Sequence, residues 1–313
     1  MKGMEISRRF FEEVGAPMID NKFSEYKKYM AIGLVGEGSE CFGFDDEFSK
    51  DHDFGPGFLI WLPQYIFDEI GSELQREYDA LPKSFLGFHR IVTAYAQGRV
   101  GVNSIEAFYK KYTNLTNSPK DNIEWLTIPS EFLATATNGM VFVDYYGEFS
   151  KRRNELKAYY PSDVAKKKMA AYSVLMGQSG QYNYPRSINR RDYQAAYLAC
   201  AEFVRNAMNA IYVLNEEYIP FYKWCFRKAE QFVVCQNSVK MLKKLSCIGE
   251  GFEIKDEKVN LIEEICKDIV EALNIKSLTK STDLFMQIQG EDLMANIEDT
   301  RLKNIHIMVD SIK

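Results

Sequence analysis

Hydrophobic residues form short continuous runs in the first half of the chain. Two of these runs predict strands, one at residues 31–35 and one at about 51–62, which is interrupted at 54–57 and has a buried apolar run at 58–62. A third run, β-branched and aromatic, follows Asn138-Gly139 and predicts a turn and then a strand that ends at Asp144. Periodic apolar positions between these runs predict helices at 5–15, 22–30, 64–80, 104–112 and 128–137.

The pattern becomes helical beyond about residue 160. The longest amphipathic stretch, 191–214, is rich in alanine, which favours a helix. We therefore expect an α+β protein, with a small mixed β-sheet in a domain of residues 1–160 and an all-α helical bundle in residues 161–313. The helices predicted for the bundle are 163–176, 191–214, 221–246, 256–273 and 290–311.

Composition limits the classes of partner. With 313 residues and a hydrophobic content of 46%, the chain can bury a core in one large or two modest domains. A net charge of −5 argues against a general nucleic-acid binder, which needs a basic surplus. Basic residues in the middle of the chain favour a small polyanion such as a nucleoside triphosphate, or they form solvated helix faces. They are Lys151, Arg152, Arg153, Lys157, Lys166, Lys167, Lys168, Arg186, Arg190 and Arg191.

Cysteine usage and hydropathy indicate a cytoplasmic protein. The six cysteines include no Cys-x-x-Cys pair and there are three histidines, which disfavours a zinc site. The first nine residues are charged where a secretory leader would be apolar, and no apolar run reaches membrane-spanning length. Free thiols in such a chain are typical of a reducing compartment.

Two motifs follow the first predicted strand. Gly38-Ser39 forms a small-residue turn whose backbone N–H groups and serine hydroxyl can approach a phosphate. After a spacer of eleven residues comes Asp51-His52-Asp53. Side chains two residues apart on a strand share a face, so the carboxylates of Asp51 and Asp53 can bind one Mg²⁺ (or Mn²⁺) ion. The pair of motifs indicates phosphoryl or nucleotidyl transfer. Asp45 and Asp46, between them, are predicted to fix the loop, with substrate contact as the alternative.

Together these motifs resemble the nucleotidyltransferase superfamily, which has a polymerase-beta-like fold. The residues from Gly43 to Asp53 are most similar to the branch of kanamycin and streptomycin nucleotidyltransferases. The chain resembles still more an uncharacterised bacterial family of that type, through Gly36-Glu-Gly-Ser-Glu, Asp51-His-Asp-Phe-Gly-Pro, Gly177-Gln-Ser-Gly-Gln-Tyr-Asn and Phe221-Tyr-Lys-Trp. The resemblance runs from about residue 6 to 224 and implies that residues 1–160 form the catalytic domain.

The resemblance also implies a third carboxylate on a neighbouring strand. Asp144 is the candidate, either as the general base that takes the proton from the attacking hydroxyl or as a third metal ligand. Glu148 is the competing carboxylate. Alternatively, Asp144 caps the turn that follows its strand.

The helical half supplies further candidates for ligand contact. Lys223, with Tyr222 beside it, is predicted to bind a phosphate, because a lysine between aromatic residues is costly to desolvate unless an anion satisfies it. The alternative is a surface lysine whose stem lies on apolar neighbours. Gln178, Gln181 and Arg186 lie in a polar segment punctuated by glycines, predicted to contact the acceptor or the base or else to form a simple interhelical loop.

The expected function is therefore that of an Mg²⁺-dependent nucleotidyltransferase. It would move a nucleoside monophosphate, AMP from ATP in most of the resembling enzymes, to a hydroxyl of a small-molecule acceptor and release pyrophosphate, in a cleft between the two domains. Three alternatives stay open: a protein or tRNA acceptor, a catalytically silent nucleotide-binding regulator, and a purely structural protein. The acidic balance weighs against tRNA, and intact Asp51 and Asp53 weigh against a silent regulator.

Overall fold

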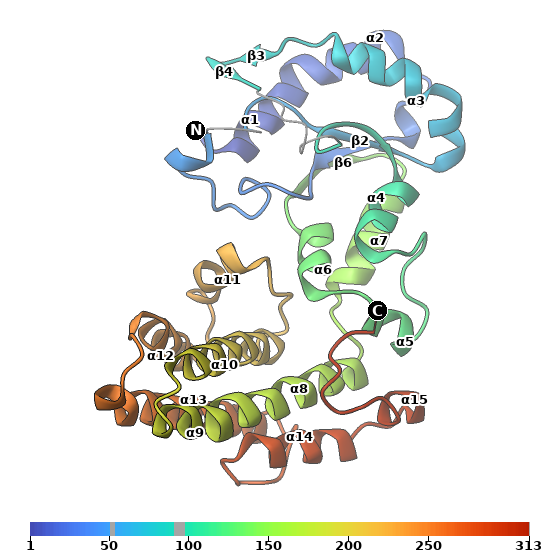
Figure 1. The fold of residues 1–313 in the computed structure, drawn as a ribbon. Coiled ribbons are helices and arrows are strands. Elements are labelled where there is room, and N and C mark those ends of the chain that lie inside the picture. The colour runs from blue at the N-terminus through green and yellow to red at the C-terminus, as the bar shows by residue number, and fades with distance from the viewer. Residues whose placement is uncertain (51–53, 91–97, 313) are drawn as a thin grey trace. The chain divides into compact units, whose positions relative to one another are not determined.

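The computed structural model describes residues 1–50, 54–90 and 98–312 (Figure 1). It has the expected α+β class, with a small mixed sheet near the N-terminus followed by a helical region. The chain forms two compact units. The first contains Met1–Ser118 and Phe132–Ala158, and the second contains Pro119–Glu131 and Tyr159–Lys313. The second unit has helices and no strand among its described residues, and it includes a short segment that precedes residue 132.

The sheet of the first unit determines where its loops emerge. Its strand order is β5-β2-β1-β6, and β1 is antiparallel to both of its neighbours. Gly33 therefore lies opposite Leu59 and Leu34 opposite Met140, so the chain leaves β1 and enters β2 and β6 at the same end of the sheet. The strands are β1 (Ala31–Leu34), β2 (Leu59–Leu62), β5 (Gly101–Ser104) and β6 (Met140–Asp144), with a separate hairpin of β3 (Ser84–Phe85) and β4 (Phe88–His89).

The strand predicted at 51–62 is confirmed for Leu59–Leu62, which form β2 and are all buried, whereas residues 54–58 precede the strand. Trp61 stacks on Phe149 with ring centroids 3.9 Å apart, while Ile60 and Leu62 pack with apolar side chains of the helices that cover the sheet. The helices of the first unit are α1 (Gly3–Phe10), η1 (Phe11–Gly15), α2 (Ala16–Lys22), η2 (Lys27–Tyr29), η3 (Glu47–Lys50), α3 (Gln64–Asp79), α4 (Ile105–Thr113) and α7 (Glu148–Lys157). A further helix, α6 (Ser130–Thr137), begins in the second unit and continues into the first.

The first predicted helix continues beyond its predicted end. Gly15 was expected to terminate the helix at 5–15, but the chain continues through the π-helical turn η1 into α2. A Cβ atom on Gly15 would overlap the ring of Phe58. The glycine is therefore present for close packing and not for termination.

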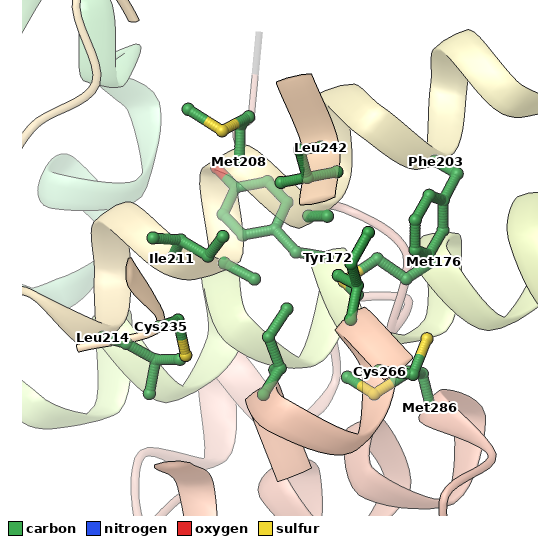
Figure 2. Close-up of a cluster of buried hydrophobic side chains, with 14 of the residues drawn as sticks. Tyr172, Met176, Phe203, Met208, Ile211, Leu214, Cys235, Leu242, Cys266 and Met286 are labelled. Atoms are coloured by element: carbon green, nitrogen blue, oxygen red, sulfur yellow. The ribbon is translucent and has the colours of Figure 1, made fainter. Parts of the chain in front are cut away.

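The second unit is built around the long helix α10. Figure 2 shows its core, where Tyr172 and Met176 of α8 meet Phe203, Met208 and Ile211 of α10, together with side chains from α12, α13 and α14. The helices are α5 (Asn122–Thr127), α8 (Ser162–Met176), η5 (Gly177–Asn183), α9 (Tyr184–Asn189), α10 (Tyr193–Leu214), α11 (Tyr222–Ala229), α12 (Gln236–Cys247), η6 (Phe252–Ile254), α13 (Lys255–Ile275), α14 (Met286–Ala295) and α15 (Thr300–Lys303). Among them, none combines the length and the apolar character that a membrane crossing requires.

Two of the long helices predicted for the bundle are interrupted. The stretch 221–246 forms α11 and α12, separated by a turn in which Cys235 has a left-handed φ of 57°. The stretch 290–311 contains only the end of α14 and the short α15.

Two lysines predicted to face a polyanion or solvent are buried. Lys167 and Lys168 of α8 have exposed fractions of 0% and 1%. The Lys167 ammonium donates to the carbonyls of His306 and Ile307, at 3.1 Å each, and to that of Val309. Lys168 donates to the carbonyl of Asp310 at 2.8 Å. Both lysines therefore attach the segment 306–310 to α8, and burial lowers the pKa of each from 10.5 to about 8.

The stability of the second unit should therefore depend on pH through these lysines. Because their pKa is lower in the folded state, the unfolded chain binds more protons between pH 8 and 10.5, and stability rises with pH in that window. Relative to Lys168→Met, the wild-type free energy of unfolding should increase by on the order of 2 kcal/mol from pH 7 to pH 9.5. Chemical denaturation at both pH values measures it. Lys166→Met, which removes a half-buried lysine paired with Asp163, is the control, and an equal pH response in both variants would contradict this account.

Candidate functional site

The predicted small-residue turn is present at the end of β1. Gly36 and Gly38 have φ angles of +123° and +125°, which L side chains rarely adopt. The amide of Asn138 holds Gly36 from both sides: its Oδ1 accepts from the Gly36 N–H at 2.8 Å, and its Nδ2 donates to the Gly36 carbonyl at 2.8 Å. A Cβ atom on Gly36 would lie 2.9 Å from the hydroxyl of Tyr112. The turn thus has a fixed backbone and little room for side chains.

The first acid of the turn, Glu37, is paired with helix α4. Its carboxylate accepts a hydrogen bond from the Tyr112 hydroxyl at 2.9 Å and lies 2.7 Å from the Lys111 ammonium. Burial favours the neutral acid, but Lys111 and Tyr112 outweigh it and lower the pKa of Glu37. Glu37 is therefore ionised at neutral pH and fixes the turn to α4.

The second acid of the turn, Glu40, was not singled out from the sequence. Its carboxylate folds back over Gly38, with its oxygens 2.7 and 2.8 Å from the place of a Cβ atom on that glycine. Burial raises the pKa of Glu40, against the opposing effects of its own backbone N–H and of the guanidinium groups of Arg90 and Arg99. Its position directly after Ser39 is the signal that could have identified it.

The loop acids Asp45 and Asp46 fix the chain after the turn, as predicted. Asp45 is buried and its Oδ2 accepts from the backbone N–H of Gly3 at 2.9 Å. Asp46 Oδ1 accepts from the N–H groups of Phe48 and Ser49 at 3.1 and 3.2 Å. These bonds anchor the start of α1 and the short helix η3.

The predicted metal ligands Asp51 and Asp53 lie outside the described residues. The chain reaches β2 at the end of the sheet where the Gly36–Ser39 turn leaves β1, because Leu59 lies opposite Gly33. Within residues 1–50, 54–90 and 98–312, no three His, Cys, Asp or Glu side chains are arranged to hold a metal ion. The binding of metal by Asp51 and Asp53 stays a prediction.

Asp144 is not close to the Gly-Ser turn, contrary to the expectation from sequence. It does end a strand next to β1, but it pairs with Ala31 at the start of β1, whereas the turn follows the end of β1. At about 3.3 Å per residue, the four residues of β1 separate these ends by about 10 Å. Both oxygens of Asp144 also accept backbone N–H groups, from Gly147 at 2.7 Å and Ser150 at 2.8 Å. The alternative role, capping of the following turn, is the one that the structure has.

Glu148, the competing carboxylate, is engaged as well. It begins α7 and forms an ion pair with Arg152, whose side chain is only 11% exposed. Arg152 also donates to the carbonyl of Thr116, and Arg153 donates to those of Asn138 and Gly139 at 2.8 and 3.1 Å. These basic residues therefore bind oxygens of the protein itself, whereas the sequence predicted either a bound polyanion or a solvated helix face.

Lys223 and Tyr222 lie at the exposed start of α11. The side chain of Tyr222 is 88% exposed, and Lys223 is exposed with its ammonium 5.4 Å from the centroid of the Trp224 ring. The argument that Lys223 needs an anion to offset desolvation is thus wrong, since water reaches it. The predicted contact of both residues with phosphate has no support from burial.

The polar segment at residues 177–183 is the π-helical turn η5 and not a loop. The amide of Gln181 donates to Glu263 at 2.8 Å and to the Leu284 carbonyl at 2.9 Å, and it accepts from the Met286 N–H at 2.8 Å. Gln181 is therefore occupied in joining helices.

The glycines of this segment serve packing, because a Cβ atom on Gly180 would overlap the Phe203 ring. Gln178 is exposed. Arg186, also exposed, donates to the Tyr182 hydroxyl at 2.7 Å and lies over its ring. Gln178 and Arg186 are thus open to solvent, and their contact with a substrate stays a prediction.

Comparison with known proteins gives one partial match. A family model described as a domain of unknown function (DUF4037) matches residues 125–225. No curated protein matches the chain. The matched segment includes Asp144 and Lys223 but neither Gly38 nor Ser39, so it does not reach the turn at the end of β1.

Replacement of Asp144 by alanine should reduce stability. The variant loses two charge-assisted bonds to the start of α7, which should lower the free energy of unfolding by about 1–2 kcal/mol. Thermal or urea unfolding measures this. Asp79→Ala, at the C-terminal end of α3, removes an exposed acid as a control. Unchanged stability of Asp144→Ala together with loss of a measured transfer activity would restore the catalytic assignment.

Replacement of Asn138 by alanine should loosen the Gly36–Ser39 turn. It leaves the Gly36 N–H and carbonyl without their partners, a cost of about 2 kcal/mol. Hydrogen exchange read by mass spectrometry should accelerate at residues 36–41. Asn117→Ala, in an exposed loop, is the matched control, and unaltered exchange in Asn138→Ala would show that the turn is held by other contacts.

Proposed function

We propose that the protein is an Mg²⁺-dependent nucleotidyltransferase. It moves a nucleoside monophosphate, AMP from ATP, to a hydroxyl of a small-molecule acceptor and releases pyrophosphate. The observation that supports this most is the two-glycine turn at Gly36–Ser39. Its backbone is held by Asn138, and it lies at the end of the sheet where β2 begins.

The turn is suited to bind the phosphates of the triphosphate. Both glycines have positive φ angles, so backbone N–H groups and the Ser39 hydroxyl can approach phosphate oxygens that a side chain would exclude. The acceptor hydroxyl releases its proton to solvent water as its oxygen attacks the α-phosphorus, the bond from that phosphorus to the bridging oxygen breaks, and the β- and γ-phosphates leave as pyrophosphate. Positioning of these groups supplies much of the rate.

Two carboxylates spaced i, i+2 are a donor set that suits Mg²⁺, which takes one or two carboxylates and substrate phosphates. We assign this role to Asp51 and Asp53. The ion supplies neutralisation of charge on the phosphate oxygens. Asp144 and Glu148 have no part in the proposed reaction, because their carboxylates hold the start of α7 and Arg152.

The roles of the second unit are secondary in this proposal. Contacts of Lys223 and Tyr222 with the nucleotide, and of Gln178 and Arg186 with the acceptor, stay predictions from the sequence, because exposure leaves the four side chains accessible but is not evidence for a ligand. Gln181 is left out because its amide joins helices. All six cysteines are free thiols, which favours the cytoplasm as the compartment.

The proposed metal ligands give the decisive test. Asp51→Asn and Asp53→Asn should each lower Mg²⁺-dependent turnover of triphosphate by on the order of a hundredfold or more, because a neutral amide is a weaker ligand for a hard cation. The assay incubates the protein with each labelled triphosphate, Mg²⁺ and a cell extract, and identifies the products by mass spectrometry.

Asp46→Asn is the matched control, since asparagine can still accept the backbone bonds of that loop. Full turnover in both Asp51→Asn and Asp53→Asn would refute the metal site. Label on a protein or on tRNA would move the proposal to a macromolecular acceptor. Triphosphate that binds without turnover would indicate a regulator.

A further inference from the structure

The Gly36–Ser39 turn carries an anion of its own. The carboxylate of Glu40 folds back onto the turn so that its carbon lies 2.7 Å, and its oxygens 2.7 and 2.8 Å, from the place of a Cβ atom on Gly38. This face of the glycine lacks a side chain, and it is where the proposed function brings the phosphates. A carboxylate and a phosphate are both anionic oxygen acceptors, so the same donors can serve either group.

Two arginines act electrostatically on the same carboxylate. The charges of Arg90 and Arg99 both act on Glu40, and Arg99 also acts on Cys41 and Tyr112, which border the turn. A guanidinium group binds carboxylate or phosphate oxygens through the same planar set of N–H donors. A triphosphate carries several charges where Glu40 carries one, so it interacts more strongly with these cations.

The two acids of the turn differ in how they are held. Glu37 is fixed by the Tyr112 hydroxyl and the Lys111 ammonium. For Glu40 the hydrogen-bond donor that favours its charged form is its own backbone N–H, and burial opposes that form. Within residues 1–50, 54–90 and 98–312, departure of the Glu40 side chain therefore breaks no hydrogen bond or ion pair to another element, whereas departure of Glu37 breaks two.

We propose that Glu40 is an acidic gate of the nucleotide site, whose carboxylate covers Gly38 and is displaced when a polyphosphate binds. This inference rests on the proposed function. Because binding requires the displaced conformation, the apparent affinity is the intrinsic affinity reduced by the fraction of molecules in which Glu40 has moved away. The gate selects for polyphosphates, since a singly charged anion gains too little from the arginines to displace a carboxylate.

The test compares two substitutions that remove the same charge three residues apart. Glu40→Gln keeps the size of the side chain and should bind both Mg²⁺-ATP and inorganic tripolyphosphate roughly tenfold more tightly than wild type. Glu37→Gln should weaken binding of both, because it releases the turn from α4. Titration calorimetry gives the dissociation constants, and thermal unfolding verifies that each variant is folded.

The remaining outcomes separate this inference from the proposed function. If both variants bind more tightly by the same factor, the effect is general electrostatics and the gate is refuted. If Glu40→Gln loses Mg²⁺-dependent binding, Glu40 is a metal ligand and not a gate. If wild type and Glu40→Gln bind triphosphate equally, the gate fails while the proposed function stands. If wild type binds no triphosphate, the proposed function fails and the gate with it.

Discussion

The amide of Asn138 is the interaction on which the organisation of the first unit depends. Its two hydrogen bonds to Gly36 join the end of β1 to the start of β6, two segments separated by about a hundred residues. Next to it, the Gly139 N–H donates to the Cys41 carbonyl at 2.8 Å. Gly33, three residues before Gly36, allows the same close approach, because a Cβ atom there would overlap the backbone of Met140. The shape of the turn follows from this crossing of the two segments.

Elements with local signals could be predicted from the sequence, and those that depend on distant contacts could not. The helix predicted to begin at residue 104 is α4, and Ser104 caps it, with its hydroxyl accepting from the Ala107 N–H at 3.0 Å. By contrast, Gly15 and Gly180 have the local signature of a break and yet lie in continuous helical segments, because their purpose is contact with Phe58 and Phe203. A glycine that ends a helix and a glycine that lets another chain segment approach are identical in sequence.

The same distinction between local signals and distant contacts applies to the residues of the candidate site. The small-residue turn after β1 was predictable, because glycine spacing and an apolar strand are both local. The position of Asp144 was not, since the sequence shows that a strand ends there but not which end of β1 it meets. Lys167 and Lys168 were misplaced for a related reason. Their partners are backbone carbonyls of the segment 306–310. Because every residue has a backbone carbonyl, the sequence does not show which ones will accept these hydrogen bonds.

A nucleotide site that works by positioning must be rigid where it binds phosphates and yet open to them. In the proposed site, Glu37 meets the first requirement and Glu40 the second, and the two acids lie within four residues of chain. Glu37 is neutralised by Lys111 and makes the backbone rigid. Among the described residues, Glu40 is held less firmly, by its own backbone N–H and by the charges of Arg90 and Arg99. If both acids were fixed, the glycine face would be closed to phosphate.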